Sequence, residues 1–148
     1  MARLGRDPSF LPLTLSTVHS FGDAGRTSPA VRAGADAVFR RAREANAAAA
    51  ECWAALLGGC DAPGTRALPG RLRDLTEATA MFAGRRWWQG DGSQHRYRIA
   101  RAQRRIEEAI GEQDGAEFAE AFVGYDQAVA TALVRAYNRH TRLESPAR

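Results

Sequence analysis

Apolar residues recur every three or four positions over most of the chain after residue 27, which is the spacing of amphipathic α-helices. Ser28 followed by Pro29 marks the start of the first helix, because serine caps a helix N-terminus and proline suits its first position. Gly58 and Gly59 mark its end. The pattern predicts an all-α four-helix bundle within residues 28–144, with helices at 29–57, 71–83, 93–113 and 114–142.

The connections between these helices are predicted from turn-forming residues. Residues 58–70 are rich in glycine and proline and are expected to form a loop. Gly84 is the expected C-cap of the second helix, and residues 85–92 form the next connection. Ser93 and Asp114 are the expected N-caps of the third and fourth helices.

Residues 1–27 lack helical periodicity and predict an extended N-terminal arm. Leu11, Leu13 and Leu15 alternate with other residues as they would on a strand. A single strand cannot stand alone, so the arm either lies over the bundle, which we expect, or reaches another chain. Residues 145–148 are expected to form a short C-terminal tail.

The first and last helices have distinctive apolar faces. The first has a seam of positions spaced alternately four and three apart, half of them alanine, which allows close approach of a neighbouring helix: Val31, Ala35, Val38, Ala42, Ala45, Ala49, Cys52 and Leu56. The last has one stripe at Phe118, Phe122, Tyr125, Val129, Ala132 and Ala136. A second stripe, about 100° around the helix, includes Val123, Ala130, Val134 and Tyr137. Because a four-helix domain has little room for a central helix, this second stripe predicts contact with another chain.

Charge is sorted along the chain. All 21 residues counted as Lys+Arg are arginine, which excludes Schiff-base lysine catalysis and a P-loop lysine. Segment 85–106 holds seven arginines and one acid, whereas segment 107–120 holds six acids and no base. The short turn between the last two helices predicts an antiparallel hairpin. Its tip is therefore expected to be acidic and its opposite end basic.

The basic segment also contains neighbouring tryptophans. Aromatic faces beside guanidinium groups suit single-stranded nucleic acids and nucleotides. In the alternative interpretation the two tryptophans fold back to close the end of the bundle, and acids on a neighbouring helix, such as Asp74 and Glu77, offset the arginines. The candidate anion-binding or nucleic-acid-binding residues are Arg85, Arg86, Trp87, Trp88, Arg96, Arg98, Arg101 and Arg105.

No catalytic residue, metal ligand or cofactor is expected. The three histidines lack the Glu-x-x-His spacing of di-iron bundles, and Cys52 and Cys60 do not form a CxxC pair. The first residues lack the apolar run of a secretory signal, and no segment approaches the roughly 20 apolar residues of a membrane span. A cytoplasmic location without a membrane partner is therefore expected.

These features favour a non-enzymatic interaction protein that works through protein–protein contacts and self-associates. Head-to-tail assembly through the opposite poles of the hairpin is its natural form, and the expected interface residues are Val123, Ala130, Val134 and Tyr137. A second interpretation is a nucleic-acid-binding protein that uses segment 85–105. A third is a small-ligand or enzymatic domain in which arginines hold a carboxylate or a phosphate.

Overall fold

The computed structural model describes residues 9–22, 27–60 and 62–144. In this part of the chain the regular structure is all α-helical, which confirms the predicted class, but there are six helices instead of four: α1 (Pro12–Gly22), α2 (Pro29–Gly58), α3 (Pro63–Ala83), α4 (Arg85–Gln89), α5 (Ser93–Gly111) and α6 (Gly115–Glu144). The predicted C-terminal tail and the arm residues 1–8 and 23–26 lie outside the described residues.

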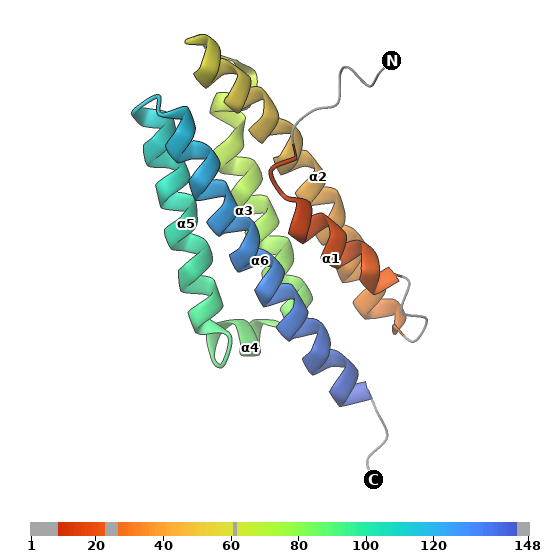
Figure 1. Cartoon of the computed structure of the whole chain (residues 1–148). Coiled ribbons are helices and arrows are strands. Elements are labelled where there is room, and N and C mark those ends of the chain that lie inside the picture. The colour runs from red at the N-terminus through yellow and green to blue at the C-terminus, as the bar shows by residue number, and fades with distance from the viewer. Residues whose placement is uncertain (1–8, 23–26, 61, 145–148) are drawn as a thin grey trace, which may run out of the picture.

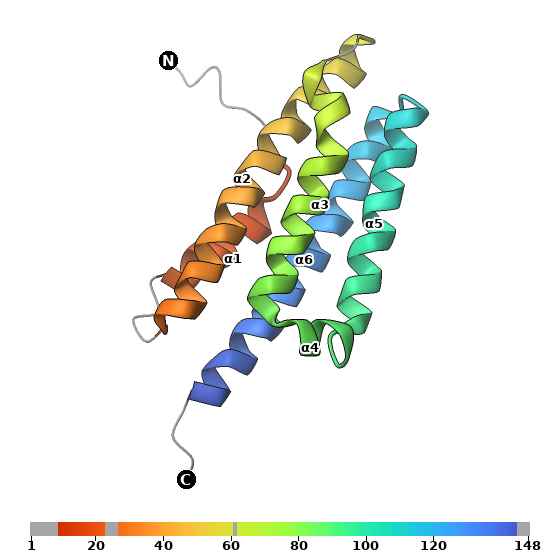
Figure 2. The ribbon, with the colours of Figure 1, turned by 180° about the vertical axis from the view of Figure 1, so that it is seen from behind.

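Helix α6 is central to the packing. It contacts α1, α2, α3 and α5, and Figure 1 shows it in front of α3, between α5 on one side and α1 with α2 on the other. Seen from behind, α3 lies between α2 and α5 (Figure 2). The first predicted stripe of α6 is completely buried in this core, as are most positions of the alanine-rich seam of α2.

Most of the predicted helix-end signals are confirmed, Gly84 as the C-cap of α3 among them, and one is wrong. The Ser28 hydroxyl accepts the backbone N–H of Val31 at 3.2 Å, and Gly59 ends α2 with a left-handed φ of 70°. Ser93 does not cap α5, because Gly92 occupies the N-cap position. The Ser93 hydroxyl instead donates to two carbonyl oxygens in the preceding turn.

The prediction of an extended arm is wrong, because Pro12–Gly22 forms helix α1. Leu13 is 47% exposed, so the apparent strand-like alternation does not describe a buried face. The buried positions are spaced three and four apart, as on a helix: Leu11, Thr14, Val18 and Phe21. Helix α1 packs against α2 and α6, which is the placement over the bundle that we expected.

Backbone hydrogen bonds from outside the helix hold the start of α1. Asp126 of α6 accepts the N–H groups of Leu13 and Thr14 at 2.9 and 2.8 Å. Asn46 of α2 accepts the N–H groups of Phe10 and Leu11 at 2.7 and 3.1 Å through its Oδ1 atom. The donors that a helix N-terminus leaves unpaired are therefore satisfied by two other helices.

The predicted loop at 58–70 is also largely wrong, since α3 begins at Pro63. A proline at the first helical position loses no intrahelical hydrogen bond, so Pro63 starts the helix instead of preventing it. Pro69 lies inside the helix, where proline removes one backbone hydrogen bond. The adjacent Leu68 is fully buried, and we infer that this packing outweighs the lost bond.

Candidate anion-binding groove

The tryptophans of the candidate site close one end of the bundle. They lie on α4, the short helix between α3 and α5 (Figure 2). Trp88 is only 4% exposed, and the ring of half-buried Trp87 stacks on His95 with centroids 5.7 Å apart. A Cβ on Gly92 would lie 2.7 Å from the Trp87 indole, so the indole packs closely against the backbone of Gly92. Trp88 therefore belongs to the core and Trp87 packs against it, as in the alternative interpretation.

The first arginines of the segment are also separated from the rest. Arg85 lies near Glu77 of α3, with 3.6 Å between Nη2 and Oε2, which is the predicted type of offset by a neighbouring acid. Arg86 is exposed on α4. Arg96 donates from Nε to the Trp88 carbonyl oxygen at 3.3 Å and so ties α5 to α4. These three side chains do not form one site with the other candidates.

The remaining three candidates are brought together on α5. Their spacing of three and four residues puts them on one stripe, beside the contact with α6. This stripe forms one wall of a groove between the two helices, and small residues on both sides keep the groove open. The groove holds about 540 Å³ and is lined by Arg98, Arg101, Ala102, Arg105, Gly124, Gln127, Ala128 and Thr131.

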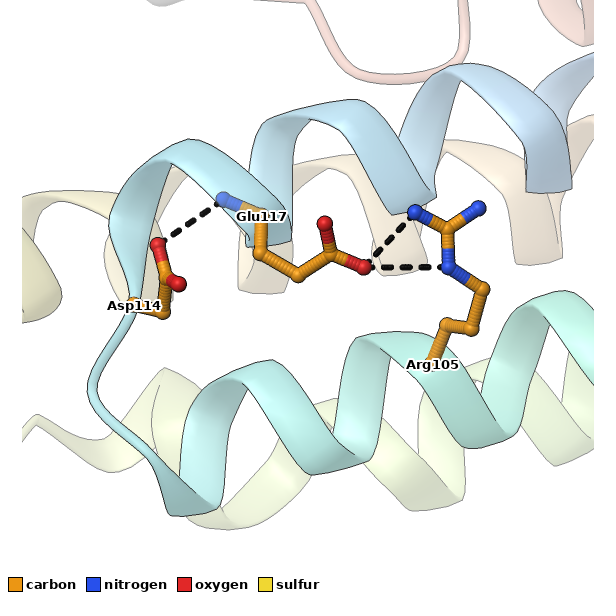
Figure 3. A network of polar contacts seen from close by, with 3 residues as sticks. All are labelled: Arg105, Asp114 and Glu117. Atoms are coloured by element: carbon orange, nitrogen blue, oxygen red, sulfur yellow. Dashed lines mark hydrogen bonds and ion pairs between the residues drawn. The ribbon is translucent and has the colours of Figure 1, made fainter.

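One of these three arginines has an acidic partner. Arg105 donates from Nε and Nη2 to the same carboxylate oxygen of Glu117, at 3.0 and 2.6 Å (Figure 3). The backbone N–H of Glu117 donates to Asp114 at 3.0 Å, which confirms Asp114 as the cap of α6. Within the described residues, Arg98 and Arg101 form no ion pair. The groove thus holds two positive charges, Arg98 and Arg101, one helical turn apart. These charges repel each other unless an anion lies between them.

A fourth arginine lies beyond the basic end of the groove, near the buried His95. Arg135 follows Gly124, Ala128 and Thr131 on the same stripe of α6. Burial, followed by the positive charges of Arg135 and Arg98, lowers the pKa of His95, which favours its neutral form. Both guanidinium groups therefore raise the electrostatic potential around this histidine.

The α6 wall of the groove was missed in the sequence. Gln127 and Thr131 supply neutral polar groups opposite the arginines. Neither a glutamine nor a threonine is distinctive alone in a sequence. Their signal is positional: small and polar residues at 124, 127, 128 and 131 lie beside the buried stripe of α6 and face the arginines of α5.

The predicted interface stripe of α6 is partly covered by α1. Ala130 is 8% exposed, and the Tyr137 ring stacks on Phe21 of α1 with centroids 4.1 Å apart. Val123 and Val134 remain 57% and 40% exposed. Helix α1, which the sequence did not predict, therefore covers part of this stripe, and contact of Val123 and Val134 with another chain stays a prediction.

The described residues show few other groups with functional chemistry. No group of three or more His, Cys, Asp or Glu residues in this part of the chain is placed to hold a metal ion. Cys52 is buried, which raises the pKa of its thiol, whereas Cys60 is exposed. No described helix has both the length and the apolar character to cross a bilayer, and the cytoplasmic location stays a prediction.

Comparison with protein-family models, with curated proteins and with solved structures finds no match to this chain.

Proposed function

We propose that this chain is a non-enzymatic binding protein that holds an anionic partner in the α5–α6 groove. The observation that supports this most is the pair of guanidinium groups, Arg98 and Arg101, that line a groove without an acidic partner in the described structure. An anion between them replaces repulsion with charge-assisted hydrogen bonds.

The chemistry of the groove suits phosphate or carboxylate groups. Guanidinium groups bind such anions through two parallel N–H donors and are always charged near neutral pH. Gln127 and Thr131 on the opposite wall add neutral hydrogen-bonding groups. The same walls lack a thiol, a carboxylate or an imidazole that would act as a nucleophile or a general base, which favours binding over catalysis.

Replacing both free arginines tests this proposal. The double variant Arg98→Gln with Arg101→Gln is expected to bind inorganic polyphosphate about tenfold more weakly, because each lost charge-assisted contact removes part of the affinity. The dependence of affinity on salt should also become shallower, since fewer counterions are released. Isothermal titration calorimetry at several salt concentrations measures both effects.

A matched control separates the groove from overall charge. Arg40 on α2 and Arg73 on α3 are exposed, and replacing both with glutamine removes the same charge from another surface. This control is expected to retain most of the affinity. Equal losses in the two double variants would show that polyphosphate senses only the net charge, and the proposed site would be wrong.

Self-association is the second proposal, with the acidic tip of one copy as the anionic partner of another. The tip residues Glu108, Glu112 and Glu120 are exposed and lie in or within two turns of the connection between α5 and α6, while the free arginines lie farther along the same hairpin. Complementary poles of this kind produce a head-to-tail contact, which continues into chains unless it closes into a ring. Val123 and Val134 are the exposed apolar residues that such a contact would cover.

A charge swap tests this second proposal by sedimentation velocity at low salt. The wild type is expected to associate with increasing concentration and to dissociate at high salt. Arg98→Glu with Arg101→Glu should be monomeric, as should Glu108→Arg with Glu112→Arg, and mixing these two variants should restore association. A wild type that stays monomeric at high micromolar concentration and low salt would rule out self-association and leave the groove open to another anion.

A further inference from the structure

We propose that the anionic partner of the groove is single-stranded nucleic acid, with phosphates on Arg98 and Arg101 and one base stacked on Tyr97. This inference rests on the proposed anion-binding function and names its ligand class. It moves the stacking role from the tryptophans, which are packed into the bundle, to a residue outside the original set of candidates.

Tyr97 is an accessible aromatic residue next to the groove. Its side chain is 64% exposed on α5, and it lies one helical turn from Arg101. The guanidinium carbon of Arg96 lies 4.8 Å from the centroid of the Tyr97 ring, in a cation–π contact. Arg96 is itself held by its hydrogen bond to the Trp88 carbonyl oxygen. Arg96 therefore supports the Tyr97 ring, and a base can stack on this ring.

The distribution of charge along the groove sets the path of the strand. Beyond Arg105, the exposed residues Glu108 and Glu112 continue the same face of α5 toward the acidic tip, and Glu117 already occupies Arg105. These carboxylates repel phosphates. The bound single strand of nucleic acid is therefore confined to the part of the groove that runs from Arg105 toward Arg135. Arg98 and Arg105 are about 10 Å apart along the helix axis, which is the length of a short strand segment with a few phosphates.

The same features favour nucleic acid over an acidic protein. A protein partner generally requires an apolar, desolvated centre in the interface, and the groove walls offer only small apolar side chains between the arginines. Single strands need a different pair of features, a positive track for the backbone and an aromatic ring for the bases. Arg98, Arg101 and Tyr97 provide both within two turns of one helix.

The test measures fluorescence anisotropy of a labelled 12-nucleotide oligo-dT at 50 mM salt, alongside calorimetric titration with inorganic polyphosphate. Tyr97→Ala is expected to bind the oligonucleotide about tenfold more weakly, because base–aromatic stacking is lost. Tyr97→Phe keeps the ring and should bind as the wild type does. Met81→Ala, which removes another exposed side chain, is the control and should have no effect.

The result with polyphosphate distinguishes the inference from the proposed function beneath it. Polyphosphate has no bases, so its affinity should be unchanged in Tyr97→Ala. If Tyr97→Ala binds oligo-dT as tightly as the wild type, or if poly-glutamate binds more tightly than oligo-dT, the nucleic-acid inference is overturned and the anion groove stands. Equal weakening for both probes also overturns it, because the ring would then act on the groove itself. If the wild type binds none of these polyanions, the proposed function fails as well.

Discussion

Replacing Asp126 with alanine is expected to lower the free energy of unfolding by about 3 kcal/mol, a large part of the 5–15 kcal/mol typical of a small domain. The Asp126 side chain is only 3% exposed, and Thr14, which it contacts, is fully buried. Its carboxylate accepts two backbone N–H groups of α1 and, through Oδ1, the Thr14 hydroxyl at 2.7 Å. Alanine leaves the two backbone N–H donors without a partner, and each buried unpaired donor costs about 1–3 kcal/mol, whereas the Thr14 hydroxyl keeps the carbonyl oxygen of residue 126 at 3.3 Å.

Two further variants define this effect in chemical denaturation. Asp126→Asn keeps the volume and one acceptor oxygen, so its loss should be intermediate, at about 1–2 kcal/mol. Asp36→Ala removes an exposed aspartate from α2 and should change stability by less than about 0.5 kcal/mol. Amide hydrogen exchange at Leu13 and Thr14 should accelerate in Asp126→Ala, because the start of α1 is released. Unchanged stability and exchange in this variant would contradict the role assigned to Asp126.

The same aspartate explains why α1 was missed in the sequence. Helix starts are recognised by a capping residue within the helix's own segment, as Ser28 and Asp114 were. The acceptors for α1 come instead from Asp126 and Asn46, which are far away in the chain. The local signals for α1, the spacing of its buried residues and Pro12 at its first position, competed with a strand-like alternation of leucines.

In the candidate site, too, local features could be predicted from the sequence and features set by distant residues could not. That Arg98, Arg101 and Arg105 share a stripe follows from helical periodicity and was predictable. No local pattern specifies how α4 turns across the end of the bundle. This turn decides which aromatic residues are buried, as Trp88 is, and which are exposed, as Tyr97 is. Likewise, the groove exists because Gly124 and Ala128 of α6 face the arginines, a pairing set by the register of two packed helices.

Replacing Gly64 with alanine is expected to destabilise the protein by about 2 kcal/mol, although alanine is the better helix former. A Cβ at this position would lie 2.6 Å from the Glu51 Cβ and 2.8 Å from the Ala48 carbonyl oxygen. Both contacts are on α2, and the carbonyl belongs to its backbone, so relief requires the two helices to separate. Overpacking of this kind costs about 1–3 kcal/mol or more, against a gain of up to about 1 kcal/mol from helix propensity.

Gly70 provides the matched comparison, because it lies in the same helix but has space. A Cβ there meets only the Nη2 atom of Arg73, at 3.7 Å, which is an ordinary contact. Gly70→Ala should therefore stabilise the protein by about 0.5–1 kcal/mol, through helix propensity alone. Thermal unfolding of the two variants separates packing from propensity. If both alanines stabilise the protein, α2 and α3 are not in the close contact described. The start of α3 at Pro63, in a glycine- and proline-rich segment, would then lose its main packing support.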